Sequence, residues 1–460
     1  MARTQLLEIE PIRNLKFRHL WALGVGAVIG DGIFLLIGEG IAVAGPSAIL
    51  AYIIAGLFQF FLMIALAELA IGMPSAGGMS VWVERFMGKW WGFLSGFAFA
   101  AGWVIAGGGV SMALGTITSW YFPQLSGAFW TTLYAIIFVT IFAILNILGT
   151  AIAARTQLYM VLVLTGGMAL FAIIGLKDVN LSHFTEWFPH GTDGFISAIP
   201  MGTYAYLGAI SIVTAGSETI NSRDLPRALI WSSITFIVIY SAAQFVLQGI
   251  IPWNEVTIDS SPFTEAANIV FGYAGAFIIN FIAWIAAATC ILMGTFYTAS
   301  RIFYAQARRG YLPKFFGYLH PKTRTPVYGI IFIWACSVIF ILIGSINPNL
   351  IYVEFSLQLT LAWVVSWTLA VIAGILYRKN AKEEVMRLPW KQWAYPLFPI
   401  LGLIGMGIVF YGTFIGAPMV LVRGLIWMVL LYVFYRIYTK NGENTIGLDE
   451  TKDKNKTVNL

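Results

Sequence analysis

The chain has 460 residues, of which 59% are hydrophobic and only 10% are charged, and its mean hydropathy is +0.81. Because a soluble domain carries roughly 25% charged residues, this composition excludes a soluble protein and indicates an integral membrane protein. The formal charge of +6 is not gathered in a basic, aromatic-rich soluble domain, so it gives no sign of nucleic-acid binding and is expected to contact anionic membrane lipid.

Apolar runs near the ~20 residues that a helix needs to cross a bilayer recur along almost the whole chain. They are too long and too continuous for the alternating strands of a β-barrel, so the sequence predicts an all-α fold. Twelve transmembrane helices are expected, at residues 20–43, 47–72, 90–118, 128–148, 156–176, 196–217, 229–251, 271–299, 328–345, 350–377, 396–415 and 418–438.

The distribution of basic residues predicts the orientation. With the N-terminus in the cytoplasm, only Lys177 and Arg423 of the 27 Lys and Arg residues lie near the outer face. This asymmetry is the one that the positive-inside rule describes. We therefore expect a multi-pass protein of the cytoplasmic membrane with both termini in the cytoplasm. Its N-terminal segment would be residues 1–18 and its flexible tail residues 440–460.

The first span is predicted to be interrupted. The run from Gly24 to Phe34 holds four glycines and Asp31 within an apolar stretch. Glycine loosens helical structure, and a carboxylate at membrane depth is costly unless it is paired or lines a wet cavity. A broken helix near the midplane is where secondary transporters hold their substrates, because its freed amides and carbonyls become ligands.

A second interruption is predicted midway through the sixth span, where Gly208 and several polar groups lie between Thr203 and Ser211. The first and sixth spans are five positions apart. In an inverted repeat of five helices, the corresponding first helices are the broken ones and meet at the midplane.

Four groups of motifs are similar to those of a known family, the amino acid, polyamine and organocation transporters, and specifically to its bacterial amino acid permeases. The motifs are residues 24–34 with 44–47, 67–70 with 74–78, 204–210 with 214–218 and 224–228, and 300–313 with 321–326. The resemblance implies a leucine-transporter-like fold that works by alternating access. Five helices (residues 19–177) would be repeated with inverted topology (178–378), and an inner loop and two peripheral helices would follow (379–439).

In such permeases the substrate carboxylate is held by amides of the first break and its amine by carbonyls of the sixth-helix break. The dipoles of the half-helices favour that arrangement. The resemblance thus implies a substrate site that includes Gly30, Gly32 and Ile33, although close helix packing is an alternative for the glycines. The other predicted substrate-binding residues are Ile29, Asp31, Trp103, Gly107, Tyr204, Tyr206, Gly208, Ala209 and Met293.

Asp31 departs from the Ser or Thr that the family usually has at this position. It could cap the second half-helix, carry a proton, or meet the ammonium group of a cationic substrate. Thr289 and Thr295 are candidate sodium ligands, although such hydroxyls often bond their own backbone. Residues 161–167 lack the lysine of proton-coupled relatives. Sodium coupling, proton coupling through Asp31 and uncoupled exchange all stay open, and no other cofactor is expected.

The sequence thus predicts a secondary active permease for an amino acid, with membrane lipids as its surroundings. The alternatives are an amino acid or amine exchanger, a polyamine-like organocation carrier and, in another class, a transporter-fold sensor. No hydrolase triad, metal cluster or Walker loop is present in the sequence, so no enzyme activity is expected. The identity of the substrate and the oligomeric state are left open.

Overall fold

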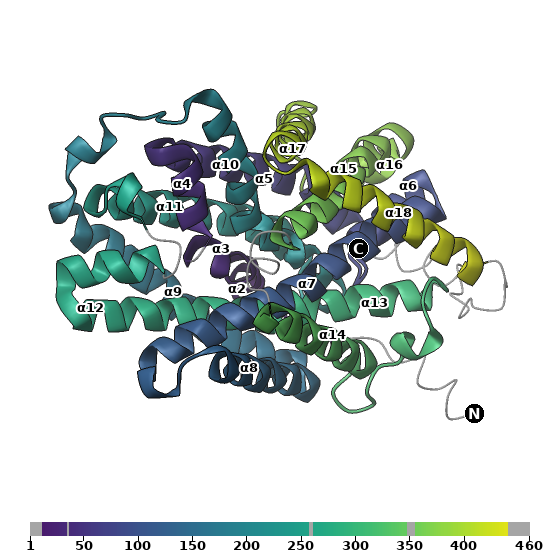
Figure 1. The fold of residues 1–460 in the computed structure, drawn as a ribbon. Helices are drawn as coiled ribbons and strands as arrows, with labels where there is room; N and C mark the ends of the chain where they lie inside the picture. Colours follow the sequence, from purple (N-terminus) through teal and green to yellow (C-terminus); the bar gives the residue numbers. More distant parts are fainter. Residues whose placement is uncertain (1–11, 35, 257–260, 347–354, 440–460) are drawn as a thin grey trace.

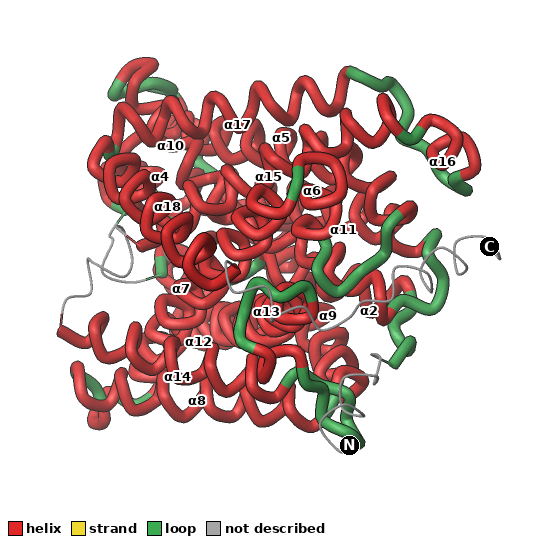
Figure 2. Tube along the Cα trace, turned by 90° about the vertical axis from the view of Figure 1, so that its right-hand side faces the viewer, coloured by secondary structure: helices red, strands yellow, loops and turns green. Residues whose placement is uncertain are grey.

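A computed structural model describes residues 12–34, 36–256, 261–346 and 355–439, and for Asp31 it describes the backbone alone. Within these ranges the regular structure is helical, and the single β-bridge joins Leu15 to Thr219. Figure 2 shows the helices running side by side with short loops between them. The all-α prediction is therefore confirmed for the described residues. The predicted tail at 440–460 and the predicted start of the tenth span at residue 350 lie outside them.

The helices fall into two sets along the chain (Figure 1). Those of the first half are α2 (Phe17–Val28), α3 (Asp31–Phe34), α4 (Ile37–Ala44), α5 (Ala48–Gly72), α6 (Met79–Met87), α7 (Lys89–Tyr121), α8 (Ala128–Leu148) and α9 (Thr150–Gly175). Those of the second half are α10 (Gly191–Tyr206), η5 (Leu207–Glu218), α11 (Asp224–Ile250), α12 (Pro262–Thr289), η7 (Cys290–Thr298), α13 (Ala299–Arg308), α14 (Val327–Ile346), α15 (Ser356–Asn380), α16 (Lys382–Arg387), α17 (Leu397–Gly416) and α18 (Pro418–Thr439).

Eleven helical stretches in the described part are long and apolar enough to cross a membrane. The first predicted span is not among them as a continuous helix, because it is divided into α2, α3 and α4. The fourth predicted span coincides with α8, which lies between Gly127 and Gly149, two glycines with positive φ. The count of twelve membrane crossings stays a prediction.

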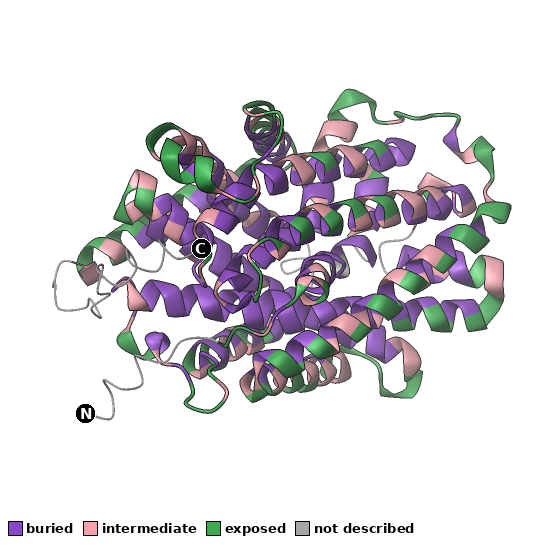
Figure 3. Cartoon of the chain, turned by 180° about the vertical axis from the view of Figure 1, so that it is seen from behind, coloured by how far each residue is buried: buried purple, intermediate pink, exposed green. Residues whose placement is uncertain are grey.

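Helix α2 forms the centre of the bundle. It packs against α9, α11, η5 and η7, and its residues from Ala22 to Val28 are buried. The outer helices are different, since Val429 and Leu430 on α18 are 63% and 64% exposed. Figure 3 shows this contrast between a buried interior and an exposed rim. Exposed apolar surface on this scale would be a liability in water, and it suits a helix that faces lipid.

Both predicted interruptions coincide with changes in helical geometry. Helix α2 ends at Val28, Ile29 takes extended backbone angles (φ −76°, ψ 103°), and α3 begins at Asp31. The sixth span does not come apart in the same way. At Tyr206 (φ −105°, ψ 0°) it changes from the α-helix α10 to the 3₁₀-helix η5, so a change of helix type replaces the expected gap.

The eighth span is longer and less regular than predicted. The predicted range was 271–299, whereas the structure has a helical stretch from Pro262 to Arg308. It is kinked at Gly272, where φ is +65°, and it passes through the π-helix η7 before continuing as α13. Hydrogen bonds in a π-segment reach one residue further along the chain than those in an α-helix, and such segments often occur at functional sites.

Candidate functional site

The two interruptions face each other. Tyr240 on α11 has its hydroxyl oxygen 3.1 Å from the carbonyl oxygen of Val28 and 3.4 Å from that of Ala205. The first carbonyl belongs to the last residue of α2, and the second lies one residue before α10 ends. One phenol therefore supports both chain breaks, since its single proton can be donated to either carbonyl.

The backbones approach closely at the same place, and glycine makes this possible. A Cβ at Gly208 would overlap the carbonyl oxygen of Ala27. A Cβ at Gly32 would lie 2.9 Å from the Cα of Ala205. Any side chain at these positions would push the first and sixth spans apart. Gly32 and Gly208 therefore let the two breaks pack closely against each other. This packing leaves the backbone amides at the first break available as ligands, so the predicted binding role stays a prediction.

A small cavity lies between the breaks. Its volume is about 20 Å³, which is space for little more than one water molecule. Of the predicted residues, Gly32, Trp103, Tyr204 and Gly208 line it. The lining residues that the sequence did not indicate are Ala27, Val28, Ala106, Val110, Ala205, Leu207, Cys290, Leu359 and Trp363.

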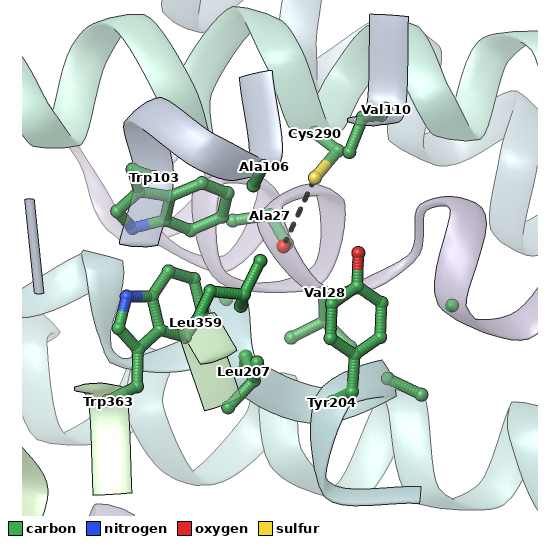
Figure 4. A pocket seen from close by; sticks show the side chains of 13 residues that line it. Ala27, Val28, Trp103, Ala106, Val110, Tyr204, Leu207, Cys290, Leu359 and Trp363 are labelled. Carbon is green, nitrogen blue, oxygen red and sulfur yellow. Dashed lines mark hydrogen bonds between the residues drawn. The ribbon is translucent and has the colours of Figure 1, made fainter. Parts of the chain in front are cut away.

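Aromatic rings form two sides of this cavity. Figure 4 shows Trp103 and Trp363 on one side and Tyr204 on the other. The two indole rings are 4.8 Å apart, and Trp363 donates its Nε1–H to the carbonyl oxygen of Phe99 at 2.9 Å. The Nε1 of Trp103 is buried and has no hydrogen-bond partner. A buried N–H without a partner is costly.

The polar groups that face the cavity are mostly those of the backbone. The carbonyl oxygen of Ala27, near the C-terminal end of α2, points into it, and the Sγ of Cys290 lies 3.8 Å from that oxygen (Figure 4). The C-terminal end of a helix carries a partial negative charge, which attracts a cation such as an ammonium group. Among the lining residues none has a charged side chain.

The remaining residues predicted at the first break lie beside the cavity. Ile29 and Ile33 are fully buried. Gly30 borders η7, because a Cβ there would lie 3.2 Å from the Cβ of Cys290. Asp31 provides the first residue of α3, and its side chain lies outside what the structure describes. The amides at the start of a helix have no partner within that helix and are available to an anion.

Three predicted residues lie in the packed core and do not line the cavity. Tyr206 packs against Phe236 and Tyr240 in tilted arrangements, with ring centroids 5.3 and 5.0 Å apart. Ala209 and Met293 are fully buried. Of the two tyrosines, Tyr204 therefore lies at the cavity and Tyr206 packs beside it.

The two threonines proposed as ion ligands differ in their bonding. Thr289 donates its hydroxyl to the carbonyl oxygen of Ala286 at 2.8 Å, which is the backbone bonding expected of a helical threonine. The Oγ1 of Thr295 and the Oγ of Ser337 are buried without partners. Both lie beside Gly107, where a Cβ would be 2.5 Å from the Ser337 hydroxyl oxygen. Gly107 thus belongs to this second polar spot and not to the cavity.

Gln157 on α9 was not indicated by the sequence. Its side-chain Nε2 donates to the carbonyl oxygen of Ala22 at 3.4 Å, while its Oε1 is buried without a partner. The residue is fully buried and links α9 to the middle of α2. A neutral amide therefore joins the fifth span to the first, shortly before residues 161–167, which lack the lysine of proton-coupled relatives.

A buried ion pair closes one end of the bundle. Arg301 donates Nε–H to Glu218 at 2.5 Å and Nη2–H to Thr150 Oγ1 at 2.8 Å. The two charged side chains are only 4% and 2% exposed. The backbone oxygen of Glu218 accepts the amides of Asn14 and Leu15, both at 3.0 Å. Glu218 and Arg301 together therefore join the N-terminal segment, η5, α9 and α13.

Sequence reasoning missed Cys290, Leu359 and Trp363 because their role depends on how distant helices pack. Leu359 and Trp363 both lie on α15, one helical turn apart, and α15 packs against α7. A leucine and a tryptophan at this spacing look like any lipid-facing or core pair in a membrane helix. Within the described ranges, no group of three or more His, Cys, Asp or Glu residues is placed to hold a metal ion.

Comparison with known proteins gives a consistent result. The family described as amino acid permease matches residues 19–445. The amino-acid permease RocE of Bacillus subtilis is 26% identical over 453 residues, covering 93% of this chain and 95% of that protein. The D-serine/D-alanine/glycine transporter of Escherichia coli K12 is 28% identical over 400 residues, covering 82% of this chain and 84% of that protein.

Among solved structures, MhsT in complex with L-phenylalanine has a similar fold. Its TM-score is 0.66 at 13% identity, and the match covers 89% of this chain and all of the MhsT chain. At this identity the likeness concerns the fold alone. The predicted leucine-transporter-like architecture is thereby confirmed, while the residue boundaries of the two repeats stay predictions.

Proposed function

The chain belongs to the amino acid permease family, and on that premise we propose that its substrate binds in the cavity between the α2–α3 break and the α10–η5 junction. The protein is a multi-pass membrane protein and a secondary transporter of amino acids. The observation that carries the proposal is the position of the Ala27 carbonyl oxygen, which faces the cavity beside the first residues of α3.

The two poles of an amino acid suit the two helix ends at this place. The ammonium group would lie against the carbonyls at the end of α2, where the helix dipole is negative. The carboxylate would lie against the free amides at the start of α3, from Gly30 to Ile33. We propose no covalent chemistry at this site, because binding and release are all that transport by alternating access requires.

The walls of the cavity favour a neutral amino acid with a small or apolar side chain. Trp103, Trp363 and Tyr204 offer aromatic surface, and Leu207 and Leu359 offer aliphatic surface. No charged side chain among the described lining residues would compensate a cationic side chain at membrane depth, where an unpaired charge is costly. The name of the D-serine/D-alanine/glycine transporter, a relative, agrees with small neutral substrates.

The cavity is small, so binding must be accompanied by a change of shape. Its volume of about 20 Å³ is too small for any amino acid. The first and sixth spans would separate to admit substrate and close again on the other side. We further propose that both termini are cytoplasmic, and that either a proton or Na⁺ drives uptake, with Asp31 as the candidate proton carrier and Thr295 as the candidate sodium ligand.

Uptake by purified protein in sealed vesicles tests the proposal. Radiolabelled alanine is offered at several pH values with and without Na⁺, and each of the other amino acids is added in excess as a competitor. Neutral amino acids should compete, and arginine, lysine and putrescine should not. Equal competition by cationic compounds would contradict the proposed substrate class. Loss of the Na⁺ dependence in Thr295→Val would assign Na⁺ as the coupling ion. Loss of the pH dependence in Asp31→Asn would assign the proton.

A further inference from the structure

A second and larger cavity lies away from the substrate site, between the beginnings of α2 and α9. Its volume is about 250 Å³, compared with about 20 Å³ for the central cavity. Asn14, Arg18 and His19 form its wall on the side of α2, and Arg155, Leu158 and Tyr159 form it on the side of α9. Transport of an amino acid through the centre of the bundle does not use this space.

The cavity is positively charged. Arg18 and Arg155 both line it, and neither forms an ion pair with any described residue. None of the described lining residues is acidic. His19 precedes the first predicted span, and burial, followed by the charges of Arg18, Lys16 and Arg155, lowers its pKa from the usual 6.5. Burial and the neighbouring cations therefore both disfavour a positive charge on His19.

Backbone geometry adds to this positive potential. Helix α2 begins at Phe17 and helix α9 begins at Thr150, so the N-terminal ends of two helices meet at one cavity. The start of a helix carries partial positive charge. At α2 the amide of Phe17 already donates to the carboxylate of Asp224 at 3.2 Å, whereas the first amides of α9 have no partner within their helix. Arg18 lies in the first turn of α2, and Ala151 in the first turn of α9 lines the cavity. Two guanidinium groups together with the start of α9 form a setting that suits phosphate.

An apolar strip on α9 leads away from the cavity. Arg155, Tyr159 and Leu162 follow one another at spacings of four and three residues, so they share one face of the helix. Tyr159 is 64% exposed and Leu162 is 51% exposed. A ligand with a charged head in the cavity could therefore lay a hydrocarbon chain along the outer face of α9. This arrangement favours a lipid over a free ion, because a free phosphate would make no use of the strip.

We propose that this cavity binds a phosphate-bearing anion, supplied by the headgroup of an anionic membrane phospholipid. Arg18 and Arg155 would hold the phosphate oxygens from the two helices. The bound headgroup would then join the N-terminal segment to α9. Asn14 and Leu15 also donate their amides to Glu218, the partner of Arg301, so lipid at this site would strengthen the same closed end of the bundle.

Lipid titration of the purified, detergent-solubilised full-length protein tests the proposal, with binding followed by native mass spectrometry and the melting temperature. The probes are phosphatidylglycerol, zwitterionic phosphatidylcholine with the same acyl chains, and soluble glycerol 3-phosphate. The test variant combines Arg18→Gln with Arg155→Gln. The matched control combines Arg223→Gln with Lys322→Gln, which removes the same charge at exposed positions outside the cavity.

Phosphatidylglycerol should bind and raise the melting temperature of the unmodified protein, and phosphatidylcholine should not. Removing two arginines near a membrane surface should weaken phosphatidylglycerol binding on the order of 30-fold, and the control should change it by less than about threefold. The melting temperature without lipid verifies that each variant is folded. If the double variant melts early, Arg155→Gln alone is compared with Lys322→Gln.

Four results would overturn the proposal. Equal binding of the two lipids, or equal weakening by the test and control variants, would remove the site. Tighter binding of glycerol 3-phosphate than of phosphatidylglycerol would assign the cavity to a soluble phosphate compound. The last result concerns a variant that combines Glu8→Gln with Glu10→Gln. If only this variant binds the lipid, and the unmodified protein does not, the N-terminal carboxylates of the chain itself neutralise Arg18 and Arg155.

Discussion

The hydroxyl oxygen of Tyr240 lies 3.1 Å from the carbonyl oxygen of Val28, the last residue of α2. This contact joins positions 212 residues apart in the sequence. It satisfies a carbonyl that has no partner within its own helix, and it brings the second half of the chain to the interrupted first span. The geometry of the substrate site therefore depends on a residue that does not line the cavity.

Replacing Tyr240 with phenylalanine tests this dependence. The Tyr240→Phe variant keeps the ring that packs on Tyr206 but leaves the Val28 carbonyl buried without its donor. We expect a loss of about 1–3 kcal/mol in stability and a higher KM for uptake. Melting temperature and uptake kinetics measure both. Tyr273→Phe, at an exposed position on α12, is the control and should change neither.

The close approach of Gly208 to Ala27 predicts that Gly208→Ala abolishes uptake. The added methyl group would overlap the Ala27 carbonyl oxygen, so the first and sixth spans must move apart and the cavity must change shape. Gly166→Ala on α9 is the matched control, since a Cβ there meets nothing within 4 Å. The control should retain uptake and gain a little stability, because alanine favours a helix. Normal uptake by Gly208→Ala would contradict the site.

Trp103 should contribute to both substrate binding and folding. Its Nε1 has no partner in the protein, so Trp103→Phe removes no internal hydrogen bond, but the smaller ring leaves space at a position that is only 1% exposed. We expect the KM for alanine to rise on the order of 10-fold and the stability to fall by about 1–3 kcal/mol. Trp231→Phe on the exposed face of α11 controls for the general loss of an indole. A KM unchanged in Trp103→Phe would place the substrate elsewhere.

The Glu218–Arg301 pair should be sensitive to the loss of one partner. Glu218→Gln leaves the Arg301 charge buried and unpaired, which is expected to cost about 3–5 kcal/mol. Combining it with Arg301→Gln removes the uncompensated charge and should recover part of the stability. The exposed pair of Arg85 and Glu384 offers a comparison, because Arg85→Gln should cost less than about 1 kcal/mol. Thermal unfolding in one detergent distinguishes these outcomes.

The sequence predicted those features that follow from composition and local spacing. Helix α8 coincides with its predicted span, because flanking glycines limit an apolar run of the right length. The first interruption was predicted correctly between Gly24 and Phe34, since four glycines and an aspartate disfavour a continuous apolar helix. The family was recognised from motifs, and its match to residues 19–445 confirms that assignment.

Features that depend on contacts between distant helices could not be predicted in the same way. The hydrogen-bond pattern of η5 is linked to the packing of Gly208 on Ala27, and single-sequence periodicity does not distinguish a 3₁₀-helix from an α-helix at this length. The π-helix η7 was not predicted, and neither were the helical residues before the kink at Gly272 and those of α13 after residue 299. The contribution of Trp363 to the cavity wall was not predicted, because the ring that it packs against, Trp103, lies 260 residues earlier in the chain.

The 3₁₀ geometry makes η5 longer than an α-helix with the same number of residues, so a change of helix type would change its length by a measurable amount. Twelve residues at a rise of ~2.0 Å span ~24 Å, whereas the same residues in an α-helix would span ~18 Å. Rewinding would therefore shorten the segment by ~6 Å and draw Thr219 away from Leu15. The distance between spin labels at Thr192 and Asn221 should shorten by a comparable amount when the bundle opens at the end that holds Glu218 and Arg301. An unchanged distance throughout the transport cycle would show that η5 moves as a rigid rod.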